Sequence, residues 1–391
     1  MRRTLPAILF WLLAAVAEAA GPVNYYVDPG GGNDTTGDGS LSTPWATVQH
    51  ALDTISPDPT YGDQINIKAG TDDTLAASLD MTTYGTPAAS TPLVLRGYSS
   101  AADDGGQGGI DCDGNSLFAD TNLDYIVLID LEIYNAGADE IIQLDNYISV
   151  IRCEIHGNSG NKAGVDIDNG GVIVGCHVYD VDGYGLFITS GGYFAHNYIT
   201  NDGGSVDMTC AIRASNYCLV ERNFISVDGA TYGIQLLGTN SRAQNNSIYH
   251  SGKASAGIDV LTGALGEVIH SNLIENFANG VDCGSSALPF SVYHNTIFNC
   301  TTDIGFVGEE IDVIPASASQ NNEIPSVSPF AKKDLSGDAA AAPTYATRYT
   351  WFAPVDTDSV YGGAWPEGNG VLDRGAVQHE ATGGGTIISA H

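Results

Sequence analysis

Positive charge is scarce in this sequence. Its 391 residues contain 14 Lys and Arg against 46 Asp and Glu, which gives a formal net charge of −32 at pH 7. A charge of this sign and size works against simple electrostatic binding of nucleic acid, anionic lipid or polyuronate. It favours solubility and the binding of cations, so we expect a protein suited to a saline or calcium-containing medium.

Long hydrophobic runs are also rare. The apolar run Leu5–Val16 follows Arg2 and Arg3 and precedes small residues up to Ala19. It is shorter than the roughly 20 residues that span a bilayer, so it predicts a secretory signal peptide over residues 1–19, with a short membrane anchor as the alternative. No later segment approaches this length, and we expect a secreted, extracellular monomer with no membrane span.

A short pattern recurs in residues 131–304. Two series of positions repeat at intervals of 21–26 residues, and each repeat holds two short alternating segments separated by Gly, Asn and Asp. Such a period indicates a solenoid of strands and turns, because each repeat can bury its apolar edge only against its neighbours. The first series is Leu131, Cys153, Cys176, Asn197, Asn223, Asn246, Asn272 and Asn295, and the second is Ile142, Val165, Leu186, Ile212, Ile234, Ile258, Val281 and Ile304.

These repeats resemble the right-handed parallel β-helix proteins of the pectate-lyase superfamily. The recurrent Asn is similar to their internal asparagine ladder, and the segment from Tyr25 to Leu52 is similar to their first strand, glycine-rich loop and capping helix. The resemblance implies an all-β, right-handed parallel β-helix over residues 61–309. The resemblance is specific evidence for the fold but only weak evidence for the activity, because one fold hosts many functions.

Both ends of the solenoid are expected to be covered. Residues 20–60 should hold a strand, a Gly-rich loop and a helix over 44–55, with Thr43 as its N-cap and Pro44 in its first turn. Strands are predicted near Gln64–Lys68, Leu93–Gly97 and Tyr125–Ile129, and a loop over 101–114. Residues 310–380 lose the period and predict an irregular C-terminal cover, followed by a flexible tail over 381–391.

The seven cysteines form no Cys-x-x-Cys or Cys/His cluster typical of zinc sites. Cys153 and Cys176 hold the same position on adjacent repeats, where strands lie roughly 4.8 Å apart, so they either bond or stack inward. Cys210 and Cys218 flank one corner, which a disulfide between them would staple.

If the second series faces inward, the next residue of each strand faces outward. That row reads Gln143, Asp166, Phe187, Arg213, Gln235, Asp259, Asp282 and Gly305. Pectate-lyase-like enzymes place their active sites on such a row, so it is the candidate surface for a polysaccharide or cell-surface glycan, with Gln235 as a substrate-binding residue.

Asp259 and Asp282 lie on adjacent repeats and are the candidate acid pair of a glycosidase, since neighbouring carboxylates raise one another's pKa. The motifs of the β-helical polygalacturonases are absent, and two solvated aspartates are the alternative. Arg213 is the only basic residue of the row. The resemblance to lyases, which use a basic residue beside bound calcium, makes it a candidate base, and a surface arginine paired with nearby acids is the alternative.

Two further groups of side chains stand out. Asp145, Asp166 and Asp168 fall on one patch of adjacent strands and predict a Ca²⁺ site, although so acidic a chain brings three aspartates together by chance as well. His177, Tyr198 and Phe224 follow consecutive positions of the first series. They are candidates for stacking on sugar rings, or they pack under a loop or the C-terminal cover.

Two functions are compatible with these observations. The first is a carbohydrate-active enzyme, a polysaccharide lyase or glycoside hydrolase acting on an extracellular polysaccharide. The second is a non-catalytic, adhesin-like β-helix that binds glycan or presents a rigid rod. The scarcity of basic residues favours the second, whereas the polar, mixed outward row favours the first.

Overall fold

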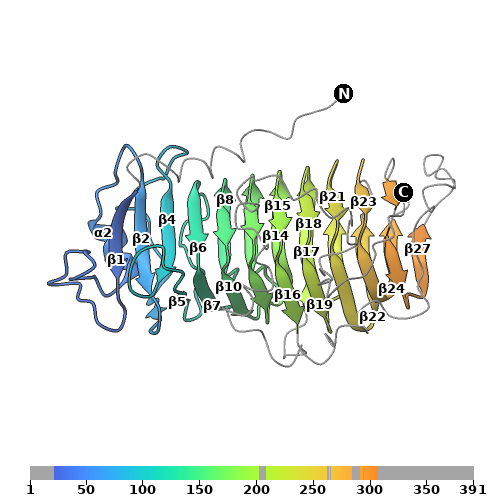
Figure 1. Ribbon diagram of the computed structural model, residues 1–391, viewed down its shortest axis with the longest axis horizontal. Helices are drawn as coiled ribbons and strands as arrows, with labels where there is room; N and C mark the ends of the chain where they lie inside the picture. Colours follow the sequence, from blue (N-terminus) through green and yellow to red (C-terminus); the bar gives the residue numbers. More distant parts are fainter. Residues whose placement is uncertain are drawn as a thin grey trace, which may run out of the picture.

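The computed structural model describes residues 22–306, apart from 202–207, 262–263, 265, 284–290 and 294. The described chain winds into an elongated solenoid in which successive strands stack side by side along the long axis (Figure 1). All strand pairs between rungs are parallel, and the strands form three faces. The predicted signal peptide, C-terminal cover and tail lie outside the described residues.

The first face is an eleven-stranded sheet. Its strands are β1 (Val23–Val27), β2 (Asp63–Lys68), β4 (Leu93–Tyr98), β6 (Ile126–Ile129), β9 (Ser149–Ile151), β12 (Val172–Val174), β15 (Tyr193–Ala195), β18 (Leu219–Glu221), β21 (Arg242–Gln244), β23 (Val268–His270) and β25 (Ser291–Tyr293). The strands predicted near residues 64, 93 and 125 are β2, β4 and β6, so these predictions are confirmed.

The second and third faces belong to one sixteen-stranded sheet, because β22 (Ser247–Val260) and β24 (Leu273–Cys283) run through the corner between them. The second face holds β3 (Asp73–Thr74), β5 (Gly108–Asp111), β7 (Leu131–Gly137), β10 (Glu154–Asn158), β13 (His177–Tyr179), β16 (Tyr198–Asn201), β19 (Phe224–Val227), the starts of β22 and β24, and β26 (Thr296–Phe298). The third face holds β8 (Ile142–Asn146), β11 (Val165–Asn169), β14 (Gly183–Ser190), β17 (Met208–Asn216), β20 (Tyr232–Leu236), the ends of β22 and β24, and β27 (Thr302–Phe306).

The predicted asparagine ladder lies at the corner between the first and second faces. Asn197, Asn223, Asn246, Asn272 and Asn295 are all fully buried. The Nδ2 of each of the first four donates to the Oδ1 of the next asparagine at 2.9–3.0 Å, and all five Nδ2 atoms donate to a backbone carbonyl of a preceding rung at 2.9–3.2 Å. The ladder therefore satisfies backbone groups that the sharp corner would leave without partners.

The corner is sharp because a left-handed residue precedes each of the first seven positions of the first series. The φ angles lie between 52° and 68° at Asp130, Arg152, Gly175, His196, Arg222, Asn245 and Ser271. Six of these seven residues are not glycine, although the left-handed region normally favours glycine or asparagine. At Asn197, Asn223, Asn246 and Asn272 the backbone N–H that follows the left-handed residue donates to the next ladder asparagine, which holds this backbone in place.

The second series fills the core of the third face. Its first seven members are fully buried, and Ile304 at the last described rung is partly buried. Glycine often precedes them because the backbone approaches its neighbour closely. A Cβ on Gly257, for example, would lie 2.4 Å from Cγ2 of Ile274.

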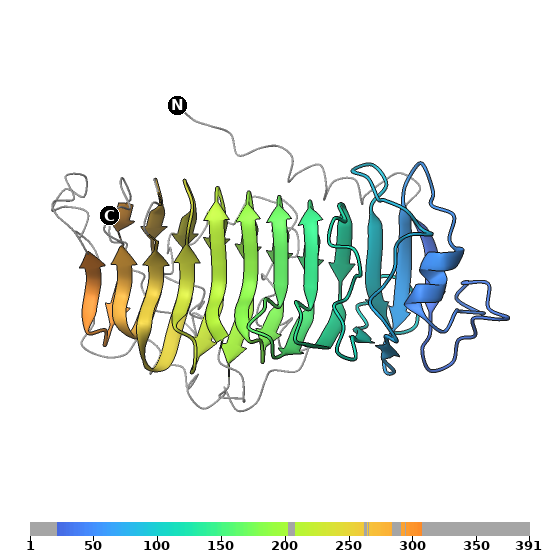
Figure 2. The same ribbon diagram turned by 180° about the vertical axis from the view of Figure 1, so that it is seen from behind.

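The helix α2 covers Val48–Thr54, a shorter segment than predicted, and its N-cap is Thr47. The Thr47 side chain accepts from the His50 backbone N–H at 3.2 Å and donates to Asp34 at 2.9 Å. Thr43 instead closes a turn with Ser40, so its prediction as the N-cap is wrong. The helix lies at the β1 end of the solenoid, with Val48, Ala51 and Leu52 buried (Figure 2).

Two other expectations need correction. The segment 101–114 is not entirely loop, because β5 pairs with β3 and β7. All seven cysteines are free, so no disulfide staples Cys210 to Cys218. Cys153 and Cys176 are buried and stack inward on adjacent rungs, which was one of the two alternatives.

Candidate functional site

The outward row of the third face has the predicted register. Strand pairing places Gln143 beside Asp166, then Phe187, Arg213, Gln235, Asp259, Asp282 and Gly305, one on each successive rung. This row therefore brings together side chains that lie more than 160 residues apart in the sequence.

The end of this row nearest β27 holds a carboxylate pair. Asp259 and Asp282 are direct register partners on adjacent rungs. Gln235 donates to Oδ2 of Asp259 at 3.0 Å, and Asn279 donates to Oδ2 of Asp282 at 2.8 Å. Gln235 and Asp259 are each only 7% exposed, whereas Asp282 is half-buried. The two carboxyl groups therefore have different surroundings.

Burial raises the pKa of Asp259, and the charge of Asp282 raises it further, while the hydrogen bond from Gln235 opposes both effects. A carboxyl group with a raised pKa beside a second, hydrogen-bonded carboxyl group is the arrangement that acid-assisted cleavage requires. Tyr232 is close enough to feel the charges of Asp259 and Asp282. Burial raises its pKa, and these two charges raise it further.

A shallow hollow of about 330 Å³ lies at the adjoining corner of the second and third faces. Asp228, Thr231, His250 and Ser255 are among the residues that line it. Ser255 lies on β22 and Ala278 on β24, so the hollow is lined by the two strands that carry the carboxylate pair.

Arg213 stacks on aromatic rings. Its guanidinium carbon lies 4.4 Å from the ring centroid of Tyr184 and 5.2 Å from that of Phe187. Among the described residues, no acidic group forms an ion pair with Arg213, although its charge lowers the pKa of Asp166. Ring faces stabilise a cation, which works against the neutral form that a base requires.

Asp145, Asp166 and Asp168 lie on adjacent strands as expected, but they do not form one tight group. Asp145 interacts with Asp168 and Asp124, and burial is the largest cause that raises its pKa. Burial, Glu140 and Asp168 raise the pKa of Asp166 to about 6, which Arg213 and Lys162 oppose. Calcium requires about six to eight oxygens at roughly 2.3–2.6 Å, and the described side chains of this patch include no three ligand atoms within 4.8 Å of one another.

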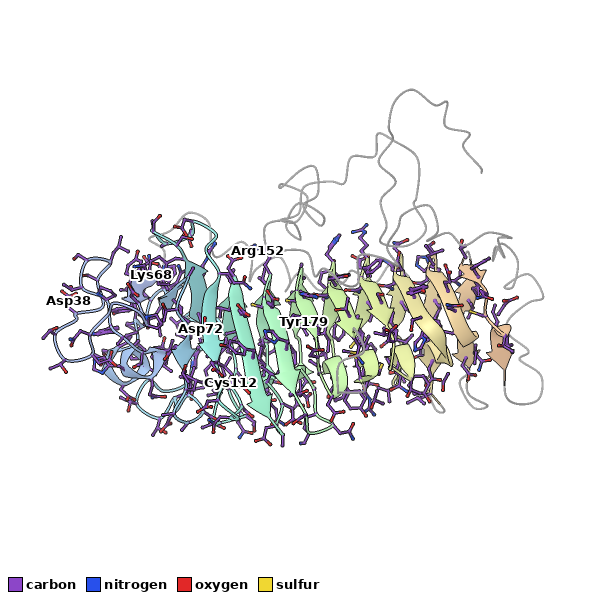
Figure 3. The ribbon with its side chains drawn as sticks, turned by 90° about the horizontal axis from the view of Figure 1, so that it is seen from below. Asp38, Lys68, Asp72, Cys112, Arg152 and Tyr179 are labelled. Atoms are coloured by element: carbon purple, nitrogen blue, oxygen red, sulfur yellow. The ribbon has the colours of Figure 1, made fainter. Side chains whose placement is uncertain are left out.

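Six rings form a continuous stack on the outward side of the second face. Neighbouring ring centroids lie 4.4–5.3 Å apart along the series Tyr134, His156, Tyr179, His177, Tyr198 and Phe224. The hydroxyl of Tyr134 donates to Asp72 at 2.8 Å. The stack then runs along the solenoid away from the β1 end, so that Tyr179 lies farther from that end than Asp72 does (Figure 3).

This stacking bears on the predicted sugar platform. The faces of His177, Tyr198 and Phe224 are turned toward one another, and His177 and Phe224 are only 2% and 6% exposed. A sugar ring stacks on a free aromatic face, and His177 and Phe224 offer little free ring face because the rings pack on one another.

Sequence reasoning missed a group of three residues, namely His156 of this stack and the adjacent Glu132 and Glu154. Their ligand atoms lie within 4.8 Å of one another, and they are the only such group of three within the described part of the chain. The signal was present, because Glu132 and Glu154 directly follow first-series positions. His156 falls two residues later on the same strand and therefore on the same side.

Comparison with known proteins agrees with this architecture. Residues 141–301 match the family described as a right handed beta helix region. No curated protein matches the sequence. Among solved structures, pectate lyase Pel9A has a TM-score of 0.54 at 14% identity over 74% of this chain and 78% of that chain. XylC in complex with xylose has a TM-score of 0.55 at 10% identity over 73% of this chain and 70% of that chain.

A glycoside hydrolase has a TM-score of 0.50 at 11% identity, and the match covers 80% of this chain and 100% of that chain. Identities this low concern the fold alone. The fold and the match over residues 141–301 together show a right-handed parallel β-helix, as the repeats predicted, and this fold is similar to that of pectate lyase Pel9A. Among the described residues, no helix is long and apolar enough to cross a membrane.

Proposed function

We propose that this protein is a secreted carbohydrate-active β-helix protein that hydrolyses glycosidic bonds of an extracellular polysaccharide at Asp259 and Asp282. The observation that carries the proposal is the carboxylate pair on adjacent rungs, one member buried with a raised pKa and the other held by Asn279. The similar solved structures include a pectate lyase and a glycoside hydrolase, which supports a carbohydrate as the partner.

The two carboxyl groups take different roles in this mechanism. Asp259 donates its proton to the glycosidic oxygen as the bond to the anomeric carbon breaks. Asp282 attacks that carbon and forms a glycosyl ester, which water then cleaves while Asp259 accepts a proton from the water. Adjacent rungs lie roughly 4.8 Å apart, closer to the roughly 5–5.5 Å separation of retaining glycosidases than to the wider pair of inverting ones.

A lyase mechanism receives less support. β-Elimination needs a base, and Arg213 would have to lose its proton while its guanidinium lies against Tyr184 and Phe187. The stacked arginine instead suits a role in contacting the hydroxyl or carboxylate groups of a bound sugar.

One observation favours a second candidate, a non-catalytic glycan-binding surface. Gln235 and Asp259 are nearly buried, so a substrate reaches the acid only along its narrow exposed edge. A protein that only recognises glycan would need no more access than this.

The test separates these functions. The purified mature protein is incubated with acidic and neutral polysaccharides, and new reducing ends and ultraviolet absorbance of unsaturated sugars are both followed. We expect reducing ends without ultraviolet absorbance. Asp259→Asn and Asp282→Asn should each lower the rate at least 100-fold, whereas Asp139→Asn, an exposed acid on the same solenoid, should not.

Other outcomes have distinct meanings. Ultraviolet absorbance lost in Arg213→Ala would establish the lyase mechanism. Glycan binding with neither signal would contradict the enzyme and establish a recognition surface. Hydrolysis that persists in both aspartate variants would contradict this choice of site.

A further inference from the structure

Glu132, Glu154 and His156 converge on the second face, away from the Asp259–Asp282 pair. Glu132 on β7 and Glu154 on β10 are direct register partners on adjacent rungs. His156 lies two residues after Glu154 on the same strand, and its Nε2 is 3.2 Å from Oε1 of Glu132. One ligand atom from each of the three residues lies within 4.8 Å of the other two.

Neighbouring side chains hold this group in place. The His156 ring lies between Tyr134 and Tyr179, at 5.1 Å and 4.4 Å between centroids, and it is nearly parallel to both. Gln107 donates to Oε2 of Glu154 at 3.2 Å. Such contacts fix the orientation of an imidazole and a carboxylate before any ligand binds, as the groups around metal sites do.

We propose that these three residues bind a divalent transition-metal ion, for which Zn²⁺ is the appropriate probe. One imidazole nitrogen and two carboxylate oxygens are typical zinc ligands, bound at about 2.0–2.2 Å. Two ligands at that distance from one ion, at roughly the tetrahedral angle, are separated by about 3.3 Å, which agrees with the 3.2 Å between His156 and Glu132.

The chemistry of the group distinguishes the ion. Calcium binds oxygen ligands, and an imidazole is a poor substitute for one, whereas zinc binds nitrogen and oxygen together. Three protein ligands leave a fourth position open, and all three side chains are half-buried, so water or a sugar hydroxyl reaches that position from solvent. The two carboxylates and the net charge of −32 both favour a cation here.

The alternative is that Glu132 and His156 form only an ion pair. The two interpretations differ in what excess metal does. An ion pair binds no metal with defined stoichiometry, whereas a metal site takes up one ion and loses it in acid, because protons compete for the imidazole.

Equilibrium dialysis with metal analysis and titration calorimetry test the proposal on the full mature chain, with Zn²⁺, Mn²⁺ and Ca²⁺ in separate titrations. We expect one Zn²⁺ per chain, bound at least tenfold more weakly by Glu132→Gln and by His156→Asn. The matched controls are Glu140→Gln, a glutamate paired with Lys162, and His270→Asn, a histidine bonded to Gln244 on the first face. Both controls should bind Zn²⁺ as the wild type does.

Circular dichroism checks that each variant is folded, and Glu154→Gln replaces any variant that is not. Wild-type protein that takes up no Zn²⁺ at micromolar concentration would overturn the proposal. Weak uptake at several sites that is equal in all variants would overturn it too, because that is the behaviour of a generally acidic surface.

Discussion

At the residue scale, the asparagine ladder uses the full hydrogen-bonding capacity of each amide. In Asn246, Nδ2 donates to Asn272 and to the Val220 carbonyl, and Oδ1 accepts from both the side chain and the backbone N–H of Asn223. No smaller polar side chain offers two N–H donors together with an oxygen that accepts two hydrogen bonds.

Replacement of Asn246 by Ala should therefore lower the free energy of unfolding by roughly 1–3 kcal/mol, because buried groups on two rungs lose their partners. Chemical or thermal denaturation measures this. Asn122→Ala, in an exposed loop where the side chain bonds only Asp120, is the matched control and should change stability little. Equal stability of the two variants would contradict the role of the ladder.

Glu267 is the other unusual residue of the solenoid interior. It is fully buried just before β23, and neither carboxyl oxygen has a partner with hydrogen-bond geometry among the described residues. Burial raises its pKa to about 7, which backbone N–H groups of residues 240, 241 and 267 oppose. A protonated carboxyl is the form that such a site tolerates.

The folded protein thus binds the Glu267 proton more tightly than the unfolded chain does. The resulting stabilisation is complete below about pH 4.5, where it amounts to roughly 3 kcal/mol, and it is lost as the pH rises through about 7. Glu267→Gln should remove this dependence, so the difference in Tm between variant and wild type should grow in favour of the variant from pH 5 to pH 8. A difference that is constant with pH would contradict the raised pKa.

At the element scale, the period of the sequence was enough to predict the strands and their register. The first series marks the corner before each strand of the second face, and the second series marks the core of the third. This succeeded because a parallel β-helix repeats one contact pattern, so a residue's neighbours across rungs are fixed by the spacing alone.

Features without a repeat were not predictable in the same way. Thr43 and Thr47 are both plausible helix caps in the sequence, and only the contact of Thr47 with Asp34 decides between them. The stacking of Arg213 on Tyr184 is a diagonal contact, since Tyr184 pairs with Cys210 and Arg213 pairs with Phe187. The spacing of residues does not reveal such diagonal contacts.

Calcium binding remains a prediction for β8 and β11. If Asp145, Asp166 and Asp168 bind Ca²⁺, a chelator should lower the Tm and excess Ca²⁺ should restore it, since a ligand of the folded state stabilises it by mass action. Asp166→Asn should abolish the response, and Glu132→Gln should retain it because that residue belongs to another cluster. A Tm that is indifferent to chelator and Ca²⁺ in all three proteins would contradict calcium binding.

At the scale of the whole molecule, the solenoid carries a large charge of one sign along an extended rod. Lys and Arg are too few to neutralise the acids locally, since 14 basic residues face 46 acidic ones. Such a charge opposes the folded state through self-repulsion, and dissolved salt screens that repulsion.

We therefore expect salt to stabilise the protein. Raising NaCl from about 10 to 150 mM shortens the Debye length from roughly 30 to 8 Å and should increase the Tm measurably. KCl should have the same effect at equal ionic strength, because screening depends on ionic strength rather than on the identity of the cation. An additional increase with CaCl2 at matched ionic strength would indicate specific binding instead of screening. A Tm that falls with NaCl would mean that the few ion pairs, such as Arg152 with the buried Asp130, outweigh the repulsion between the acids.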